Sequence, residues 1–426
     1  MINNKKTLLK FGNKKIKLEL TDKNILGVLS AKETKPLKNP ISKLEELFEK
    51  SINVDSLDKL IRDKKAKKIL IIVNDLTRPT PYHVLLPPLL TKLDKIGIKK
   101  EDITFLIATG AHRGNTEQEN VKIFGDRLVS SYHFINHQCD DKNLIDLGKM
   151  TSGNHLSVNP IINQVDFIIT TGVIVPHYMA GFSGGRKSIL PGICGRITIE
   201  QNHAHMVHPK AVTGNLIDNP VHEEMMEATQ KIKVDFNINA ITDEEGNVID
   251  VVAGTLTESW LRGVEICRNT YICSIEERAD VIFTSAGGYP KDINVYQAQK
   301  ALDNAYQAVK PGGTIVLVAE CREGLGNTIF EKWIEEAQTI KDVEERLKKC
   351  FVLGGHKAYA VAKVAKEVDI ILLSSLHKEQ VKKLFMIPAA DIQQALNLVQ
   401  EKHGPNFRSY IIPAGSNVLP KVEMKR

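Results

Sequence analysis

The sequence predicts an α/β protein made of two doubly wound domains, each with a mostly parallel sheet. Three observations lead to this expectation. Short apolar runs bounded by turn residues recur along the chain, and segments with helical periodicity fall between them. The length of 426 residues is also too great for one ordinary hydrophobic core.

The apolar runs are expected to form buried parallel strands, because they lack the alternation of a half-exposed strand. They are KILIIV (68–73), ITFLIATG (103–110), VDFIITTGVIV (165–175), VIFTSA (281–286), TIVLVA (314–319) and DIILLSS (369–375). Helical segments such as residues 83–97 and 329–349 lie between them. A charged stretch from about Glu223 to Glu277 separates the first three runs from the last three, so we expect domains at 1–275 and 276–426.

Composition excludes several classes of protein. The formal net charge of +6 comes from scattered lysines with acids among them, which indicates a solvated surface and no nucleic-acid partner. No apolar run is long enough for a membrane span and no signal segment is evident, so we expect a cytoplasmic protein without a membrane partner. The cysteines show no CxxC spacing and are expected to be free thiols: Cys139, Cys194, Cys267, Cys273, Cys321 and Cys350.

Polar loops follow the first three predicted strands. Asp75, Thr77 and Arg78 follow the first, His112 and Arg113 the second, and His177 and Lys187 the third. In open α/β sheets, ligands bind outside the carboxyl ends of the strands. Each residue alone is more often an ordinary surface group, but three such loops at one edge favour a functional site.

The glycine-rich segment GFSGGRKSILPG (181–192) contains the most distinctive of these residues. Its glycines Gly181, Gly184 and Gly185 could let the backbone approach an anionic ligand, and Arg186 and Lys187 supply positive charge. The spacing does not match the phosphate loop GxxxxGK[ST], because Arg186 stands where that pattern needs glycine. A triphosphate-hydrolysing loop is therefore not expected.

A second interpretation is a metal site formed by His203, His205 and His208, as in a metal-dependent hydrolase. On a helix, His205 and His208 would share a face while His203 points elsewhere, so three ligands from this stretch would not converge. One of the three as a ligand is easier to accommodate.

Several separated motifs together resemble the nickel-pincer lactate racemase family. They are DLTRP (75–79), GAHR (110–113), PHYMAGFSGGRK (176–187), TIEQNH (198–203) and GGYPKDINVYQAQKA (287–301). They occur in the order of the family and are spread over most of the chain.

The resemblance implies a cofactor, a nickel-bearing pyridinium-3,5-bisthiocarboxylate mononucleotide that cofactor-synthesis enzymes load onto the protein. Lys187 matches the lysine that tethers it, and His203 matches the nickel ligand, in keeping with the preference of nickel for imidazole nitrogen. Asp75, Leu76, Thr77 and Arg78 match residues that contact the nucleotide.

The implied reaction is racemisation of a 2-hydroxy acid. His112 and His177 match the acid/base pair, and the hydride would pass to the nickel cofactor, leaving a planar 2-keto acid. Imidazole suits this role, because its unperturbed pKa of about 6.5 lies near neutrality.

Substrate contacts are implied for Gln297 and Lys300, on one face of a helix expected to open at Asp292, which would put the active site in an interdomain cleft. Lactate is the expected substrate, while malate, a longer aliphatic acid or a sugar acid would use the same machinery. Trp260 and Trp333 lie outside the matched motifs, so Tyr359 is the remaining aromatic candidate near the substrate. A binding protein that holds a hydroxy acid without converting it is the non-catalytic alternative.

Overall fold

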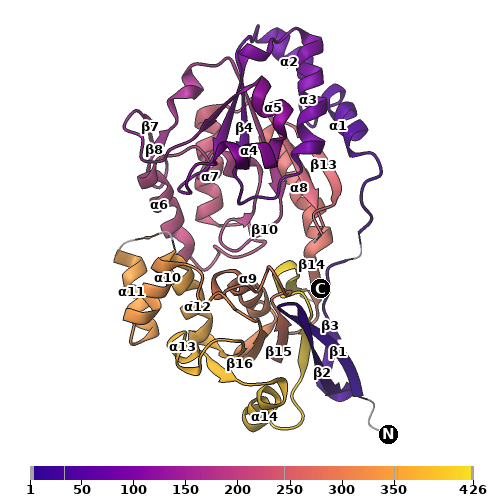
Figure 1. The fold of residues 1–426 in the computed structure, drawn as a ribbon, viewed down its shortest axis with the longest axis vertical. Helices are drawn as coiled ribbons and strands as arrows, with labels where there is room; N and C mark the ends of the chain where they lie inside the picture. Colours follow the sequence, from indigo (N-terminus) through magenta and orange to yellow (C-terminus); the bar gives the residue numbers. More distant parts are fainter. Residues whose placement is uncertain (1–3, 33, 244, 350, 353, 424–426) are drawn as a thin grey trace. The chain divides into compact units, whose positions relative to one another are not determined.

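The computed structural model describes residues 4–32, 34–243, 245–349, 351–352 and 354–423. The chain divides into two compact units, shown in Figure 1. We call Glu33–Thr270 the central unit, and Met1–Lys32 together with Tyr271–Arg426 the terminal unit. No helix within the described residues is both long and apolar enough to cross a membrane.

The central unit is built on a six-stranded sheet with the order β13-β12-β9-β4-β5-β6. All neighbours pair in parallel except β12 and β13, which are antiparallel. The strands are β4 (Ile69–Asn74), β5 (Ile103–Ala108), β6 (His133–Asn136), β9 (Phe167–Ile174), β12 (Phe236–Thr242) and β13 (Val248–Gly254). Two further small pairs are β7 (Ile145–Lys149) with β8 (His155–Val158), and β10 (Pro176–His177) with β11 (Gly181–Phe182).

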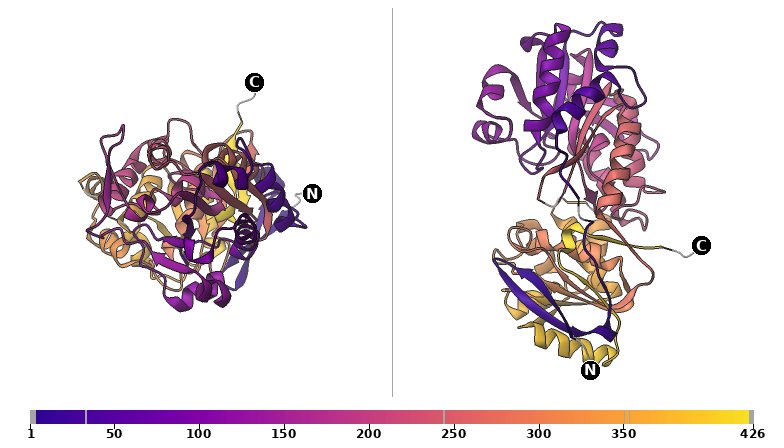
Figure 2. Two further views of the ribbon diagram at one scale, coloured as in Figure 1. Left: turned by 90° about the horizontal axis from the view of Figure 1, so that it is seen from above. Right: turned by 90° about the vertical axis from the view of Figure 1, so that its right-hand side faces the viewer.

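Helices lie on both sides of the central sheet (Figure 2). They are α1 (Pro40–Glu49), α2 (Leu57–Asp63), α3 (Tyr82–Ile96), α4 (Glu117–Phe124), α5 (Asp126–Ser131), α6 (Arg196–Ala204), α7 (Pro220–Ile232) and α8 (Leu256–Tyr271), with 3-10 turns η2 (Lys100–Asp102), η3 (Pro160–Asn163), η4 (Gly185–Ser188) and η5 (His205–Val207). The first three helices pack on one face, where Phe48, Leu85 and Leu89 join a buried core with Ile71 of β4. Every residue of β9 is buried, as expected for a strand covered on both faces.

The terminal unit contains a second six-stranded sheet, entirely parallel, with the order β18-β17-β16-β15-β19-β3. Its strands are β3 (Ile25–Val28), β15 (Ala279–Ser285), β16 (Val309–Val318), β17 (Asp369–Leu373), β18 (Ile387–Ala389) and β19 (Ser409–Ile412). A hairpin of β1 (Asn4–Phe11) and β2 (Lys14–Thr21) and a parallel pair of β14 (Ile272–Ile275) with β20 (Leu419–Val422) complete the strands. The helices are α9 (Val295–Tyr306), α10 (Thr328–Glu336), α11 (Ile340–Lys349), α12 (Gly355–Glu367), α13 (Lys378–Lys383) and α14 (Ile392–His403), with turns η1 (Asp22–Asn24) and η6 (Gly415–Asn417).

These two sheets confirm the predicted α/β class with mostly parallel strands. The N-terminal 32 residues, however, belong with the C-terminal half, whereas the sequence suggested one continuous segment from 1 to 275. The reason is packing. Leu9 and Leu18 of the hairpin join the core of the terminal sheet with Phe283 and Ile411, and β3 pairs with β19 at its edge.

The stretch Glu223–Glu277 also differs from expectation, because it contributes strands β12 and β13 to the central sheet. The apolar pattern of β12 is interrupted by Asn237 and Asn239, so its sequence lacks the continuous apolar run expected of a buried strand. Both asparagines are fully buried and satisfied by hydrogen bonds, for example from Asn237 Nδ2 to Ser259 Oγ at 2.7 Å.

The cysteines behave as expected where they can be seen. Cys139, Cys194, Cys267, Cys273 and Cys321 are free, and Cys350 lies outside the described residues. Burial raises the pKa of the Cys194 thiol, and its Sγ lies 3.1 Å from the carbonyl oxygen of Ile189. Cys194 is therefore a small core residue and not a nucleophile.

Tyr82 provides a test of how β4 is held at its carboxyl end. Its hydroxyl accepts a hydrogen bond from the Asn74 N–H, and burial raises its pKa to about 12. We expect Tyr82→Phe to lower the free energy of unfolding by roughly 1–3 kcal/mol, because a buried N–H loses its acceptor. Urea denaturation would measure the change. Tyr132→Phe is the control, because its hydroxyl has no hydrogen-bond partner among the described side chains and backbone; an equal loss in both variants would contradict the prediction.

Candidate active site

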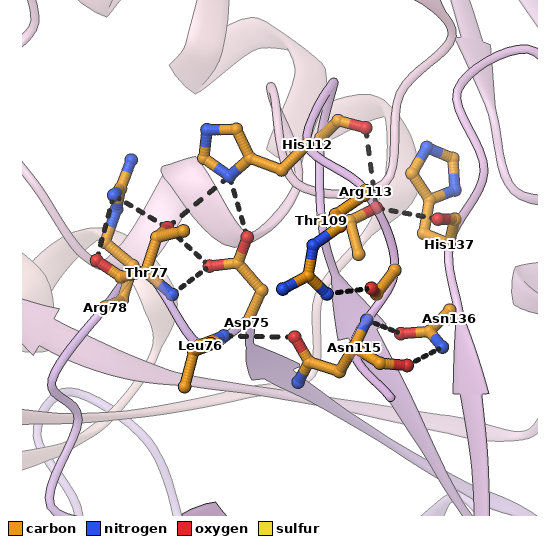
Figure 3. Close-up of polar contacts among 12 residues, drawn as sticks. Asp75, Leu76, Thr77, Arg78, Thr109, His112, Arg113, Asn115, Asn136 and His137 are labelled. Carbon is orange, nitrogen blue, oxygen red and sulfur yellow. Dashed lines mark hydrogen bonds and ion pairs between the residues drawn. The ribbon is translucent and has the colours of Figure 1, made fainter. Parts of the chain in front are cut away.

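The loop that follows β4 is organised around the carboxylate of Asp75, which is 3% exposed. Its Oδ1 accepts hydrogen bonds from the backbone N–H and the hydroxyl of Thr77, at 3.1 and 2.7 Å (Figure 3). Arg78 donates in turn to Thr77 Oγ1 at 3.0 Å. The backbone of the next residue, Leu76, is held by Asn115 Oδ1 at 3.1 Å, and its side chain is exposed.

His112 from the loop after β5 contacts the second oxygen of the same carboxylate. Its Nδ1 lies 2.7 Å from Asp75 Oδ2. Burial disfavours ionisation of Asp75, but the hydrogen bond and charge of His112, with Thr77 and Arg78, outweigh it and lower its pKa. An ionised carboxylate can only accept, so Nδ1 of His112 carries a proton, and Nε2 is the acceptor when the ring is neutral.

Several residues that hold the loops of Asp75 and His112 were not predicted from the sequence. Asn115 and Asn136 exchange two hydrogen bonds of 2.9 Å, between the backbone of Asn115 and the side chain of Asn136. Thr109 Oγ1 donates to the carbonyl of His137 at 2.7 Å. Figure 3 shows how these contacts fix the loop between β5 and α4 beside β6. Asparagine and threonine are too common in loops for this role to be read from sequence alone.

The third loop, after β9, brings His177 and Lys187 together. Lys187 Nζ lies 3.4 Å from His177 Nε2, and the Ala180 N–H donates to His177 Nδ1 at 3.3 Å. Because a backbone N–H is always a donor, Nδ1 of His177 is unprotonated and the neutral ring carries its proton on Nε2. The two histidines are thus held in opposite tautomers.

The glycines of this loop are explained by close packing within the protein. All three have positive φ, and a Cβ would lie 2.3 Å from Asn215 O at Gly181, 2.8 Å from Ile174 Cγ1 at Gly184 and 2.6 Å from Trp260 Cδ1 at Gly185. They are required by packing against the protein itself, so close approach of a ligand is not needed to account for them.

One pocket joins the three loops. It encloses about 490 Å³, counting space open to solvent. Its lining residues are Asn74, Asp75, Arg78, Ala108, Thr109, Gly110, His112, Val173, Ser183, Gly184, Lys187, Ser188, Pro191 and Gly192. The structure therefore assembles Asp75, Arg78, His112 and Lys187, with His177 in contact with the last.

His203 does not line this pocket; it is 6% exposed on α6. His205 follows in η5, with its Nε2 3.8 Å from Glu224 Oε1, and His208 accepts a 3.3 Å hydrogen bond from the Lys210 N–H. No group of three metal-ligating side chains occurs in the part of the chain that the structure describes. The three-histidine metal site of a hydrolase is not formed.

Gln297 and Lys300 lie in the terminal unit on α9, where Lys300 Nζ donates to Gln297 Oε1 at 2.9 Å. The helix does not open at Asp292 as expected. Asn294 caps it by accepting from the Gln297 N–H at 3.0 Å, while Asp292 accepts from the backbone N–H groups of Gly12 and Glu320. Asp292 thereby ties the β1–β2 turn to the loop before α9.

Comparison with known proteins identifies the family. Residues 11–214 match the model of the lactate racemase N-terminal domain, and residues 275–419 match that of the lactate racemase C-terminal domain. A curated lactate racemase of Thermoanaerobacterium thermosaccharolyticum is 33% identical over 420 residues, covering 96% of this chain and 97% of the relative. The chain belongs to the lactate racemase family.

Other members support the same assignment. The lactate racemase of Lactiplantibacillus plantarum is 32% identical over 428 residues, covering 97% of this chain and 99% of its own. The structure of the lactate racemase apoprotein from T. thermosaccharolyticum matches with a TM-score of 0.90 and 32% identity, covering 98% of this chain and 100% of that one. A crystal structure of a Thermotoga maritima protein, 22% identical with a TM-score of 0.63 over 92% of this chain and 100% of that one, shares the fold.

A substitution of Asp75 tests the site in the protein without bound cofactor. We expect Asp75→Asn to lower the unfolding free energy at pH 7 and to reduce its acid dependence. The folded-state pKa of Asp75 is lowered, so its contribution is complete above the unfolded value near 3.9 and is lost as the pH falls through the folded value. Urea denaturation between about pH 2.5 and 7 measures this.

Asp146→Asn is the matched control, because Asp146 Oδ2 is also 2.7 Å from a histidine Nδ1, that of His155, but both side chains are more than half exposed. Solvent screening should make its effect smaller. A loss in Asp75→Asn that is identical at every pH would show that the carboxylate charge is not responsible.

Proposed function

We propose that this protein is a nickel-dependent racemase that interconverts the enantiomers of a small 2-hydroxy acid, with lactate as the first candidate. The observation that carries the proposal is the Asp75–His112 pair in one pocket with Lys187, whose amine contacts His177. Membership of the lactate racemase family supports the reaction class.

The pocket residues fit the nickel-pincer nucleotide that the family resemblance implies. Lys187 offers an amine for the tether, and Arg78 offers a cation for a phosphate. We propose that Asp75, Leu76, Thr77 and Arg78 hold the nucleotide and that His203 ligates the nickel. When bound, this group supplies an acceptor for the hydride that leaves the substrate carbon.

His112 is prepared to remove the proton of the substrate hydroxyl. Its Nε2 is the free acceptor, and the Asp75 carboxylate stabilises the imidazolium that forms when the proton is taken up. The second contact of Asp75, to Thr77, prevents the carboxylate from turning away.

His177 would serve the opposite enantiomer. For its Nε2 to accept a proton, the ring must exchange tautomers, so the 3.3 Å hydrogen bond from Ala180 has to break. That bond is long, and its loss costs little. The two histidines would therefore perform the same reaction, but only His177 has to exchange tautomers first.

Gln297 and Lys300 are proposed to bind the substrate carboxylate. Their side chains already meet on one turn of α9, so an ammonium and an amide can be presented together. A carboxylate held in this way keeps its place while the planar keto acid turns to receive the hydride on the other face.

The test is conversion of a single lactate enantiomer into a mixture, followed by chiral chromatography, with protein produced alongside the cofactor-synthesis enzymes. Active preparations should contain nickel and carry the cofactor mass on the peptide of Lys187. Hydroxy-acid binding without conversion would establish the non-catalytic alternative. A panel with malate, longer aliphatic acids and sugar acids identifies the preferred substrate.

His112→Gln and His177→Gln should each slow net inversion at least ~100-fold, the usual contribution of a positioned acid or base. His155→Gln is the control, because His155 repeats the 2.7 Å contact to a carboxylate on the exposed β7–β8 pair. Unchanged racemisation in either pocket variant, with cofactor loading equal to the wild type, would refute the assigned role.

A further inference from the structure

The side chain of Arg186 is fully buried beside Lys187, with relative exposure of 0%. Its Nη1 and Nη2 donate to the carbonyls of Phe182 and Ala180 at 2.9 and 2.5 Å, and its Nε donates to His222 Nδ1 at 3.0 Å. The guanidinium also lies over the ring of Trp260, 3.9 Å from its centroid. The groups that contact the guanidinium are thus two carbonyls, an imidazole and an indole ring, and none of them is an anion.

His222 supplies no negative charge. Burial, and then the charge of Arg186, lower its pKa to about 3, so it is neutral at physiological pH. Trp260 stacks on His222 with ring centroids 5.4 Å apart, and its indole N–H donates to Ser183 O at 2.8 Å. Within the described chain, no carboxylate forms an ion pair with Arg186. A buried cation without a counter-charge is costly, so its presence calls for an explanation.

Lys187 directly follows Arg186 in η4, and the charge of Arg186 disfavours protonation of its amine and lowers its pKa. Arg78 lines the same pocket and adds a second cation. The one carboxylate in that lining, Asp75, is already hydrogen-bonded by Thr77 and His112.

Among the described residues of the elements packed against η4, no carboxylate forms an ion pair with the amine of Lys187. On α7, Glu224 accepts from Asn202 and Ser152, and His222 is neutral. His177 contacts the amine with the edge of a neutral ring.

We propose that Arg186 serves as a positioning residue that, together with burial and Arg78, keeps the amine of Lys187 uncharged and nucleophilic in the apoprotein, ready to bond to an acyl-type carbon of the cofactor. An oxygen on that carbon would leave as water, with one proton from the amine and one from solvent. This deepens the proposed function and rests on it, because attachment of the nucleotide is what such an amine would serve. Burial, then Arg78, then Arg186 lower the pKa of Lys187 well below its ordinary value. Lysines in comparable surroundings act as nucleophiles in enzymes that form covalent intermediates.

Competitive acetylation of the apoprotein, prepared without the cofactor-synthesis enzymes, tests the inference directly. With trace acetic anhydride, a bond forms between Nζ and an acetyl carbon, acetate leaves and the amine proton passes to buffer. Peptide mass spectrometry gives the rate at each lysine from pH 6 to 11. An ordinary lysine, with a pKa of about 10.4, should react roughly tenfold faster per pH unit up to that value.

Lys187 should instead reach its plateau rate well below pH 10. Lys92 is the control: it also has intermediate exposure, but Glu49 and Asp58 overcome the effect of burial and raise its pKa. A Lys187 profile that rises in parallel with that of Lys92 would overturn the inference, and no variant is needed for this result.

Two substitutions assign the effect to Arg186. Arg186→Met removes the charge and should move the midpoint of the Lys187 profile to higher pH, whereas Arg186→Lys keeps the charge and should move it less. A purely structural role would move the midpoint by the same amount in both variants, because both lose the hydrogen bonds of the guanidinium. If Lys187 shows the low midpoint but the cofactor mass never appears on it, the inference stands and the proposed function fails. If Lys187 shows an ordinary profile and the loaded protein is an active racemase, the inference fails and the proposed function stands.

Stability supplies an independent check. Between the folded-state pKa of Lys187 and about 10.4, the unfolded chain binds the proton and the folded chain does not, so stability rises with pH in this window. Lys187→Met should therefore be more stable than the wild type at pH 7, and the gain should shrink as the pH approaches about 10. Lys92→Met should show the opposite sign, because its paired charge is lost. Urea denaturation at pH 7 and 10 decides; a less stable Lys187→Met at pH 7 would contradict the inference.

Discussion

The parallel pairing of β9, β4 and β5 is the constraint on which the site depends. Because Ile72 pairs with Thr170 and Asn74 with Ala108, the three strands end at the same edge of the sheet, and the loops that follow them begin there. Asp75, His112 and Lys187 come from separate loops and meet there in one pocket. A one-residue slip of β5 against β4 would move His112 away from Asp75, so the contact between them depends on the strand register.

The loop after β9 has little regular structure, and hydrogen bonds from Arg186 hold it in place. Its guanidinium binds two carbonyls of the loop, and Trp260 of α8 covers it. Gly185 has to be glycine for Trp260 to come this close. Asn239, buried in β12, accepts from the Gly185 N–H at 2.9 Å and fixes the same turn. The cation that holds the loop is therefore also the charge that acts on the neighbouring amine, and rigidity and reactivity share one cause.

The sequence revealed what is local and missed what depends on packing. The apolar runs predicted five of the strands closely. The polar residues after the first three runs predicted that Asp75, His112 and Lys187 lie at one edge of a sheet, and the three line one pocket. By contrast, β12 was hidden because Asn237 and Asn239 interrupt its apolar pattern, although both are satisfied by partners distant in sequence. Trp260 lies outside the matched motifs, yet its ring covers the guanidinium of Arg186. The family resemblance, and not periodicity, supplied the roles of His203, Gln297 and Lys300, and these remain proposals.

Two pairs in this chain show why a carboxylate–histidine contact alone does not define a site. Asp75–His112 and Asp146–His155 have the same 2.7 Å contact between Oδ2 and Nδ1. Asp146 and His155 are both more than half exposed, so water competes for their hydrogen bond and screens their charges. The side chain of Asp75 is 4% exposed, while that of His112 is 36% exposed. The carboxylate is thus desolvated and fixed while the far nitrogen of the ring stays accessible, which is the combination that a general base requires. Burial of one partner, and not the contact distance, distinguishes the pair in the pocket from its counterpart on the surface.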